Sequence, residues 1–271
     1  MRLDLGCHPT TNYQLPISVS SVHPPSSTRW KCVVAYDGTA FQGWQSQPGG
    51  NSIQDVLERR LRRIFGHDIR IHGSGRTDAG VHALGQVFHF DADWSHGADK
   101  LLAAFAGGLP AAIQVRSARR APPGFHARFS ATGKIYFYNL YHGRRADPFA
   151  LPFCWSMPQR LDVAAMRVVA AQLAGKHDFR AFSALNGTTK DDTVRHLRRI
   201  ELTGSGARLR VTLEADGFLY KMARRLVGAL VAAGLGKSTP EEIAAILRLR
   251  ERTHRVETAP AQGLFLKKVF Y

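Results

Sequence analysis

The spacing of apolar and polar residues divides the chain into strands and helices from residue 31 onward. Strands are predicted where apolar residues alternate or cluster, at residues 31–36, 69–71, 86–90, 113–115, 134–141, 194–202, 209–215 and 263–271. Helices are predicted where apolar residues recur every three or four positions, at residues 52–65, 101–105, 162–174 and 221–233, with another from residue 240. Both halves mix strands and helices without the regular alternation of a parallel barrel, which predicts an α+β protein.

The most regular of these segments is the helix that Ser52 opens. Asp55 stands three residues later as a capping-box partner, apolar residues follow at helical spacing, and Gly66 ends the run. A similar start is predicted near the C-terminus, where Thr239 stands three residues before Glu242. The sequence therefore marks the ends of these helices as well as their apolar faces.

Two segments without hydrophobic periodicity suggest how the chain is divided. Residues 1–28 are rich in Ser, Thr and Pro and predict a flexible N-terminal extension. The segment ARRAPPGFHARFS, at residues 118–130, carries two prolines and a glycine and predicts a connector. We therefore expect an N-terminal domain over residues 29–124 and a C-terminal domain over residues 125–271.

The charge balance points to a polyanionic partner. Lys and Arg outnumber Asp and Glu by 37 to 21, a formal net charge of +16, and nucleic acid is the commonest polyanion that a soluble protein meets. The cations are spread along the chain, among them Arg59, Arg60, Arg62, Arg63, Arg195, Arg198, Arg199, Arg224 and Arg225. This dispersal predicts a broad cationic surface rather than a basic tail.

Cysteine and histidine spacings do not predict a metal site. Cys7, Cys32 and Cys154 are odd in number and far apart, and none of the 12 histidines falls into a zinc-binding spacing. No apolar run approaches the ~20 residues that cross a bilayer. We expect a cytoplasmic protein without metal, cofactor or membrane span.

Asp78 is the first candidate for chemistry, because it lies in the glycine-rich segment GSGRTDAG between two predicted strands. Arg76, two residues earlier, would favour the ionised carboxylate. The same residues also suit a surface turn in which Arg76 simply pairs with Asp78. Asp37 and Asp91 are not spaced to complete a catalytic pair or metal site with it, so a lone carboxylate suggests nucleophilic or proton-transfer work.

Aromatic residues provide the second candidate feature. Tyr136 and Tyr138 share one face of a predicted strand, near the cations Arg128 and Lys134, and such rings stack on unpaired bases. Core packing explains the same spacing equally well. Arg224 lies in a predicted helix, where a solvated face is the alternative to a role in the site.

Five segments together resemble the tRNA pseudouridine synthase A family, and the resemblance spans residues 31–271. They are YDGTAFQGWQ at 36–45, GRTDAGVHALGQVFHF at 75–90, FHARFSATGKIYFY at 125–138, GFLYKMARRLVG at 217–228 and APAQGLFLKKVFY at 259–271. The resemblance implies that Asp78 is the essential aspartate and that Arg224 pairs with it. It also implies that Arg76 lies near the space left by the flipped base and that Tyr136 contacts the uracil. Leu264 and Leu266 would form part of the pocket wall.

The resemblance also implies a reaction and an assembly. The reaction would isomerise uridine to pseudouridine at positions 38, 39 and 40 in the anticodon arm of tRNA, with no cofactor. The assembly would be a homodimer of two-domain α+β subunits, each with a mixed central sheet and a cleft between its halves. Two rival interpretations are a noncatalytic tRNA-binding or chaperone protein and a pseudouridine synthase with another RNA target. A metal-dependent nuclease or a glycosidase is a more distant one.

Overall fold

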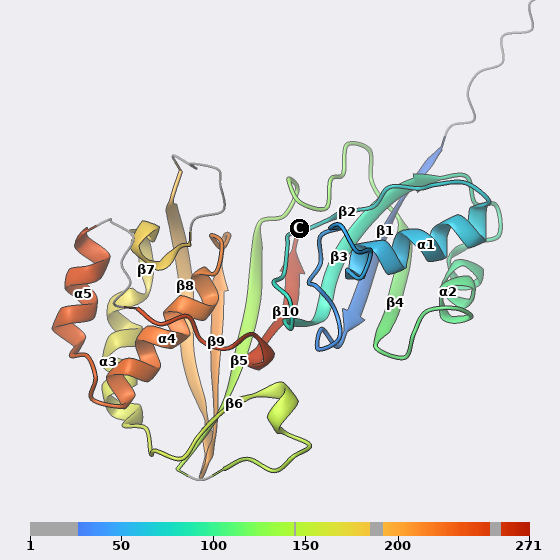
Figure 1. Cartoon of the computed structure of the whole chain (residues 1–271). Coiled ribbons are helices and arrows are strands. Elements are labelled where there is room, and N and C mark those ends of the chain that lie inside the picture. The colour runs from blue at the N-terminus through green and yellow to red at the C-terminus, as the bar shows by residue number, and fades with distance from the viewer. Residues whose placement is uncertain (1–26, 144, 185–191, 250–255) are drawn as a thin grey trace, which may run out of the picture.

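The computed structural model describes residues 27–143, 145–184, 192–249 and 256–271 (Figure 1). The strands are β1 Thr28–Tyr36, β2 His72–Gly73, β3 His82–Ala92, β4 Ile113–Arg120, β5 Gly133–His142, β6 Trp155–Met157, β7 Gly175–Asp178, β8 Val194–Ser205, β9 Arg208–Ala215 and β10 Leu264–Phe270. The α-helices are α1 Ile53–Phe65, α2 Ala98–Ala106, α3 Val163–Leu173, α4 Met222–Gly234 and α5 Pro240–Leu249.

A single mixed sheet runs through the described part of the molecule. Its strand order is β4-β1-β3-β10-β5-β9-β8-β7, with β2 paired to β3 and β6 paired to β5. The last strand, β10, lies between the halves, parallel to β3 on one side and antiparallel to β5 on the other (Figure 1). This arrangement confirms the predicted α+β fold with a mixed central sheet.

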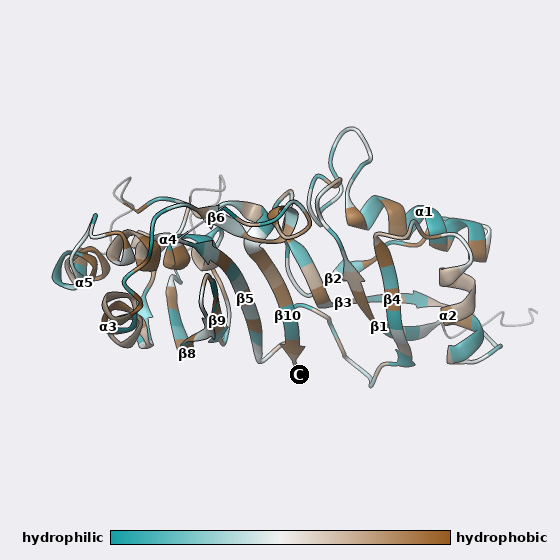
Figure 2. Cartoon of the chain, turned by 90° about the horizontal axis from the view of Figure 1, so that it is seen from below, coloured by the Kyte–Doolittle hydropathy of each residue, from teal (hydrophilic) through white to brown (hydrophobic). Residues whose placement is uncertain are grey.

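The helices gather at the two ends of the sheet. Figure 1 shows α1 and α2 beside β1, β3 and β4, while α3, α4 and α5 lie at the end formed by β7, β8 and β9. Helix α4 is hydrophobic over most of its surface, and α1 has both polar and apolar stretches (Figure 2). This difference follows their burial, since ten residues of α4 are buried in the protein but only four residues of α1 are. None of the described helices is long and apolar enough to span a membrane.

The ends of α1 and α5 follow the predicted capping chemistry. The Ser52 side chain accepts from the Asp55 backbone N–H, and the Asp55 side chain accepts in return from the Ser52 N–H. Gly66 ends α1 in the left-handed conformation with φ of 79°. Thr239 and Glu242 form the same reciprocal pair at the start of α5. Capping satisfies backbone groups that a helix end leaves without partners.

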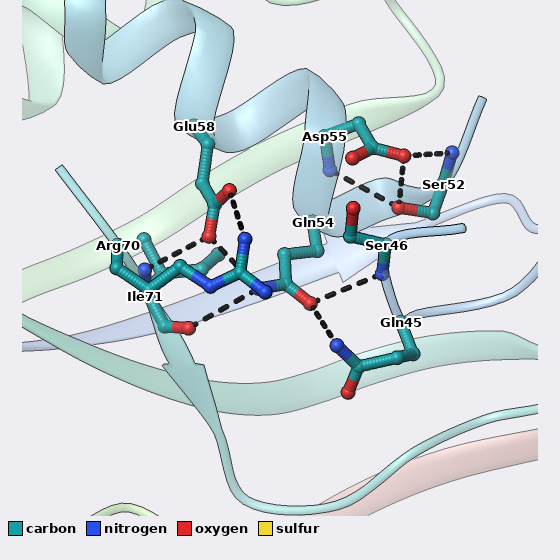
Figure 3. A network of polar contacts seen from close by, with 8 residues as sticks. All are labelled: Gln45, Ser46, Ser52, Gln54, Asp55, Glu58, Arg70 and Ile71. Carbon is teal, nitrogen blue, oxygen red and sulfur yellow. Dashed lines mark hydrogen bonds and ion pairs between the residues drawn. The ribbon is translucent and has the colours of Figure 1, made fainter. Parts of the chain in front are cut away.

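The strand predicted at residues 69–71 is wrong. Ile71 is buried, but helix α1 takes its backbone groups: the Ile71 N–H donates to the Glu58 carboxylate at 3.0 Å and its carbonyl accepts from Gln54 Nε2 at 3.4 Å (Figure 3). Side chains thus replace the partner strand that the alternating pattern suggested. Pairing with β3 begins only at His72 and lasts two residues.

Several predicted boundaries also need correction. Strand β4 continues to Arg120 and pairs with β1, so the first three residues of the predicted connector 118–130 are part of the sheet. Strand β1 begins at Thr28 rather than at residue 31, and most of the predicted N-terminal extension lies outside the described residues. The short strands β6 and β7 were not predicted, because three or four residues carry too little periodicity to identify.

Candidate active site

The segment that carries Asp78 forms a tight turn between β2 and β3. The Val81 N–H donates to the Asp78 carbonyl at 3.1 Å, and Gly80, the third residue of this turn, has φ of 76°. A side chain at this position of the turn would be strained, so the sequence requires glycine there. The turn fixes the backbone of Asp78 at the rim of the sheet.

Hydrogen bonds and close packing from neighbouring segments hold the loop before Asp78 in place. The backbone N–H of Trp44 donates to the Thr77 carbonyl at 3.0 Å, and the buried Tyr36 hydroxyl lies 2.8 Å from Thr77 Oγ1. A methyl group on Gly73 would overlap the Trp44 indole ring, so glycine permits this close approach. Lys134 Nζ donates to the Ser74 carbonyl at 2.9 Å. The residues that precede Asp78 in this loop are therefore anchored at several points.

Asp78 pairs with Arg224, which lies 146 residues away in the sequence. Arg224 Nη1 donates to Asp78 Oδ2 at 2.7 Å, and the two side chains are 15% and 22% exposed. Arg224 Nε donates to the Ala259 carbonyl at 2.7 Å, which fixes the guanidinium plane. Arg76 does not pair with Asp78; its Nε donates to Gln45 Oε1 at 3.0 Å instead. The simple turn in which Arg76 neutralises Asp78 is therefore not the arrangement found.

The two candidate tyrosines have different surroundings. Tyr136 lines the same cleft as Asp78, with its ring 4.9 Å from that of Phe218 in an edge-on arrangement. Burial raises the pKa of the Tyr136 hydroxyl above its ordinary value, and nearby Tyr36 and Asp78 raise it further. Tyr138 is fully buried and donates to the Pro260 carbonyl at 2.7 Å. Tyr136 therefore offers a neutral ring to the cleft, whereas Tyr138 belongs to the core.

These residues surround a cleft of about 1450 Å³. Its described lining carries more positive than negative side chains: Arg70, Arg76, Arg128, Lys134, Arg195, Lys221 and Arg224 against Asp78, Asp192 and Asp216. Leu264 is also in the lining, whereas Leu266, two residues further along β10, is buried and is not part of it. Asp37 and Asp91 do not contribute to the described lining.

Some side chains that shape the cleft were not singled out by their sequence pattern. Gln45 and Gln54 connect Arg76 to helix α1, and Phe129 presents a ring that is 76% exposed. Gln45 and Phe129 lie in two of the family-like segments, at 36–45 and 125–138, but no local pattern gave either side chain a role, and Gln54 lies outside those segments. In the described part of the chain, no group of three or more His, Cys, Asp or Glu side chains is arranged to hold a metal ion.

Comparison with known proteins agrees with this geometry. The family model described as tRNA pseudouridine synthase matches residues 32–130 and 169–271, which include Asp78, Arg224 and strand β10. The chain belongs to the tRNA pseudouridine synthase family. Its similarity to proteins named tRNA pseudouridine synthase A is 43% identity in Akkermansia muciniphila and 41% in Bacillus subtilis. Each comparison covers 90% of this chain, and 95% and 99% of the respective relative.

A tRNA pseudouridine synthase is an isomerase that converts uridine in tRNA to pseudouridine. The matched residues include both sides of the Asp78–Arg224 pair, which come from distant parts of the chain. A relative from Geobacillus kaustophilus carries the same printed name, with 41% identity over 90% of this chain and 94% of its own length. The family match therefore includes distant parts of the cleft rather than one motif.

Proposed function

We propose that this tRNA pseudouridine synthase modifies uridines 38, 39 and 40 in the anticodon arm, as a cytoplasmic homodimer that needs no cofactor. The observation that carries the catalytic assignment is Asp78, fixed on a tight turn inside a cationic cleft and held by Arg224 at 2.7 Å. The choice of positions and the homodimer rest on the family resemblance of the five sequence segments.

The reaction rearranges bonds without gaining or losing atoms. The C1′–N1 bond breaks, a C1′–C5 bond forms, C5 loses a proton and N1 gains one. The Asp78 carboxylate starts this sequence either by attacking C1′, which gives a covalent intermediate, or by removing the C2′ proton, which gives a glycal. A substrate with deuterium at C2′ distinguishes the routes, because only the second breaks that bond and reacts more slowly.

The surrounding side chains support this chemistry by position. Arg224 holds Asp78 Oδ2, while Oδ1 has no hydrogen-bond partner among the described residues, so Oδ1 is the atom that faces the ribose in our proposal. Tyr136 stacks on the uracil, and Arg76 enters the space that the flipped base leaves. Leu264 and Leu266 form the wall behind the base, Leu264 from the cleft surface and Leu266 from beneath it.

Binding must offset the cost of removing the uridine from its stack, which is on the order of a few kcal/mol. Phosphate contacts from the cations that line the cleft supply part of that free energy, and base stacking supplies another part. The formal net charge of +16 favours this interaction. The cleft therefore combines a cationic surface with one carboxylate that is already held in place.

Mapping of pseudouridine in an unmodified anticodon-arm transcript tests the proposal. We expect the wild-type protein, treated with a chelator, to modify positions 38 to 40, and the Asp78→Ala variant to modify none. Binding without pseudouridine would support a noncatalytic RNA-binding protein, and modification elsewhere would support another target. Cut RNA, or free uracil, would indicate a nuclease or glycosidase. Activity of Asp78→Ala would show that another residue is catalytic.

The proposed homodimer is tested separately by sedimentation equilibrium. A mass of two chains at micromolar concentration supports it, and a mass of one chain contradicts it.

A further inference from the structure

A chain of side-chain amides runs from helix α1 to Gln45 (Figure 3), and Gln45 contacts Arg76. Arg76 Nε donates to Gln45 Oε1 at 3.0 Å, and Gln45 Nε2 donates to Gln54 Oε1 at 2.9 Å. Gln54 is only 3% exposed, and its Nε2 donates to Glu58 Oε1 at 2.8 Å. A polar side chain this deeply buried requires partners of the correct polarity, so the orientation of each amide matters.

The Glu58 carboxylate determines the direction of the whole chain. An ionised carboxylate only accepts hydrogen bonds, and Glu58 accepts from both the Ile71 N–H at 3.0 Å and Gln54 Nε2. Gln54 must therefore turn its oxygen towards Gln45, and the Ser46 N–H donates to that same oxygen at 3.1 Å. Gln45 in turn must present its NH₂ to Gln54 and its oxygen to Arg76.

We propose that Gln54 is a positioning residue for Arg76, acting through Gln45, in the modification of RNA. The inference rests on the proposed function, in which Arg76 contacts the RNA. A free arginine side chain has several rotatable bonds, and fixing it in advance reduces the ordering cost when RNA binds. Gln45 uses the Nε of Arg76, and no carboxylate pairs with Arg76 in the described part of the chain, so its terminal nitrogens are left for RNA.

The alternative is that this network only stabilises the loop. Substitution of Gln54 by Met keeps the length of the side chain and removes both the oxygen acceptor and the NH₂ donor of its amide. A double-mutant cycle with Arg76→Met then separates the positioning role from the structural one. The matched control is Ser52→Ala, which removes the capping box at the start of the same helix and leaves the amide chain intact. Thermal unfolding of every variant shows how much stability each has lost.

We expect Gln54→Met to lower kcat/KM on the anticodon-arm transcript by about 10- to 100-fold in the Arg76 background, and by less than about twofold in the Arg76→Met background. Ser52→Ala should lower the melting temperature without this loss of activity. Equal losses in both backgrounds would overturn the proposal and indicate a structural role. Gln45→Met should repeat the result if Gln54→Met does not fold.

Gln54→Glu provides a second test, because it keeps an oxygen towards Gln45 but places a carboxylate against the Glu58 carboxylate and the Ile71 carbonyl. We expect it to lose activity in the Arg76 background, as Gln54→Met does, and unchanged activity would contradict the proposal. If Arg76→Met itself retains wild-type kinetics, the role given to Arg76 in the proposed function is wrong. If only Gln54→Met retains them, the positioning inference alone is wrong.

Discussion

Arg224 contacts two groups at once, and its removal should affect catalysis more than folding. Its Nη1 donates to Asp78 and its Nε to the Ala259 carbonyl, at 2.7 Å each. Arg224→Met keeps the apolar stem but leaves a partly buried carboxylate unpaired and free to rotate. We expect kcat to fall by about 100-fold or more, since a misplaced catalytic group loses the benefit of orientation.

Arg199→Met is the matched control for Arg224→Met. Arg199 also pairs with carboxylates, those of Glu201 and Glu214, but it does not line the cleft. Single-turnover rates and melting temperatures of both variants show whether the loss of rate is specific to Arg224→Met or follows a loss of stability. Comparable rate losses in the two variants would contradict a specific role for the Asp78–Arg224 pair.

At the scale of single residues, sequence patterns indicated candidates for the site, and only the family resemblance implied that Arg224 pairs with Asp78. Asp78 and Arg224 both stand in recognisable segments, yet no local pattern states that side chains 146 residues apart lie within 2.7 Å. Arg76 is close to Asp78 in sequence, but the turn directs it to Gln45. Contacts of this kind depend on how distant strands and helices pack together, and a single sequence does not specify that packing directly.

Helix α4 and the segment before β10 approach each other too closely for any side chain at Gly228. A methyl group there would overlap the Glu257 carbonyl, two residues from the Ala259 carbonyl that holds Arg224. We therefore expect Gly228→Ala to displace Arg224 from Asp78, lower stability by about 1–3 kcal/mol and lower kcat by about 10-fold or more.

Ala229→Gly, on the same helix, is the control for this element. It costs about 1 kcal/mol through helix propensity and adds no atoms against the Glu257 segment. Denaturant unfolding and single-turnover rates should show similar stabilities but a greater rate loss for Gly228→Ala. If both variants lose rate in proportion to stability, the contact between α4 and this segment does not govern Arg224.

At the scale of elements, helices were predicted well and short extended segments were not. The capping residues of α1 and α5 act locally, so their sequence signals survive in the fold. The 69–71 segment alternates like a strand, yet side chains from α1 satisfy Ile71 instead of a neighbouring strand. A strand depends on a partner from elsewhere in the chain, and alternation alone does not supply one.

Three histidines, His72, His89 and His126, lie together where strands β2 and β3 contact the 125–130 segment. Their contact should make the stability of the fold sensitive to acid. Burial lowers the pKa of His89 to about 4, and the positive charges of His126, Arg29 and His72 act in the same direction. Unfolded histidine has a pKa near 6.5. Between about pH 4 and 6.5 the unfolded chain therefore binds more protons, and the free energy of unfolding falls as the pH falls through this range.

We expect His89 to account for a loss on the order of 1–3 kcal/mol between pH 6.5 and 4. Urea unfolding across this range measures the slope, which should become shallower in His89→Gln. His196→Gln, at an exposed position on β8, is the matched control substitution. An unchanged slope in His89→Gln would assign the acid sensitivity to other groups.

At the scale of the whole molecule, net charge and the shape of the cleft make different contributions to RNA binding. The net charge of +16 produces a long-range attraction that salt weakens, whatever the RNA sequence. The cleft adds short-range contacts at one place, where seven cationic side chains and three carboxylates make up the charged part of the described lining. A substitution that removes an uncharged ring should therefore change the affinity but not its dependence on salt.

Phe129 and Phe149 test this division, because both rings are exposed but only one lines the cleft. Phe129 is 76% exposed in the cleft lining, where its ring lies 4.4 Å from that of His126; Phe149 is 90% exposed and lies outside that lining. Stacking of a base on an aromatic ring contributes about 1–3 kcal/mol, so Phe129→Ala should raise the Kd for the anticodon-arm transcript by about 5- to 100-fold. Phe149→Ala should leave it within about twofold, and both variants should keep the wild-type salt slope. Fluorescence anisotropy at several salt concentrations measures both quantities, and equal affinities of the two variants would mean that RNA does not contact this side of the cleft.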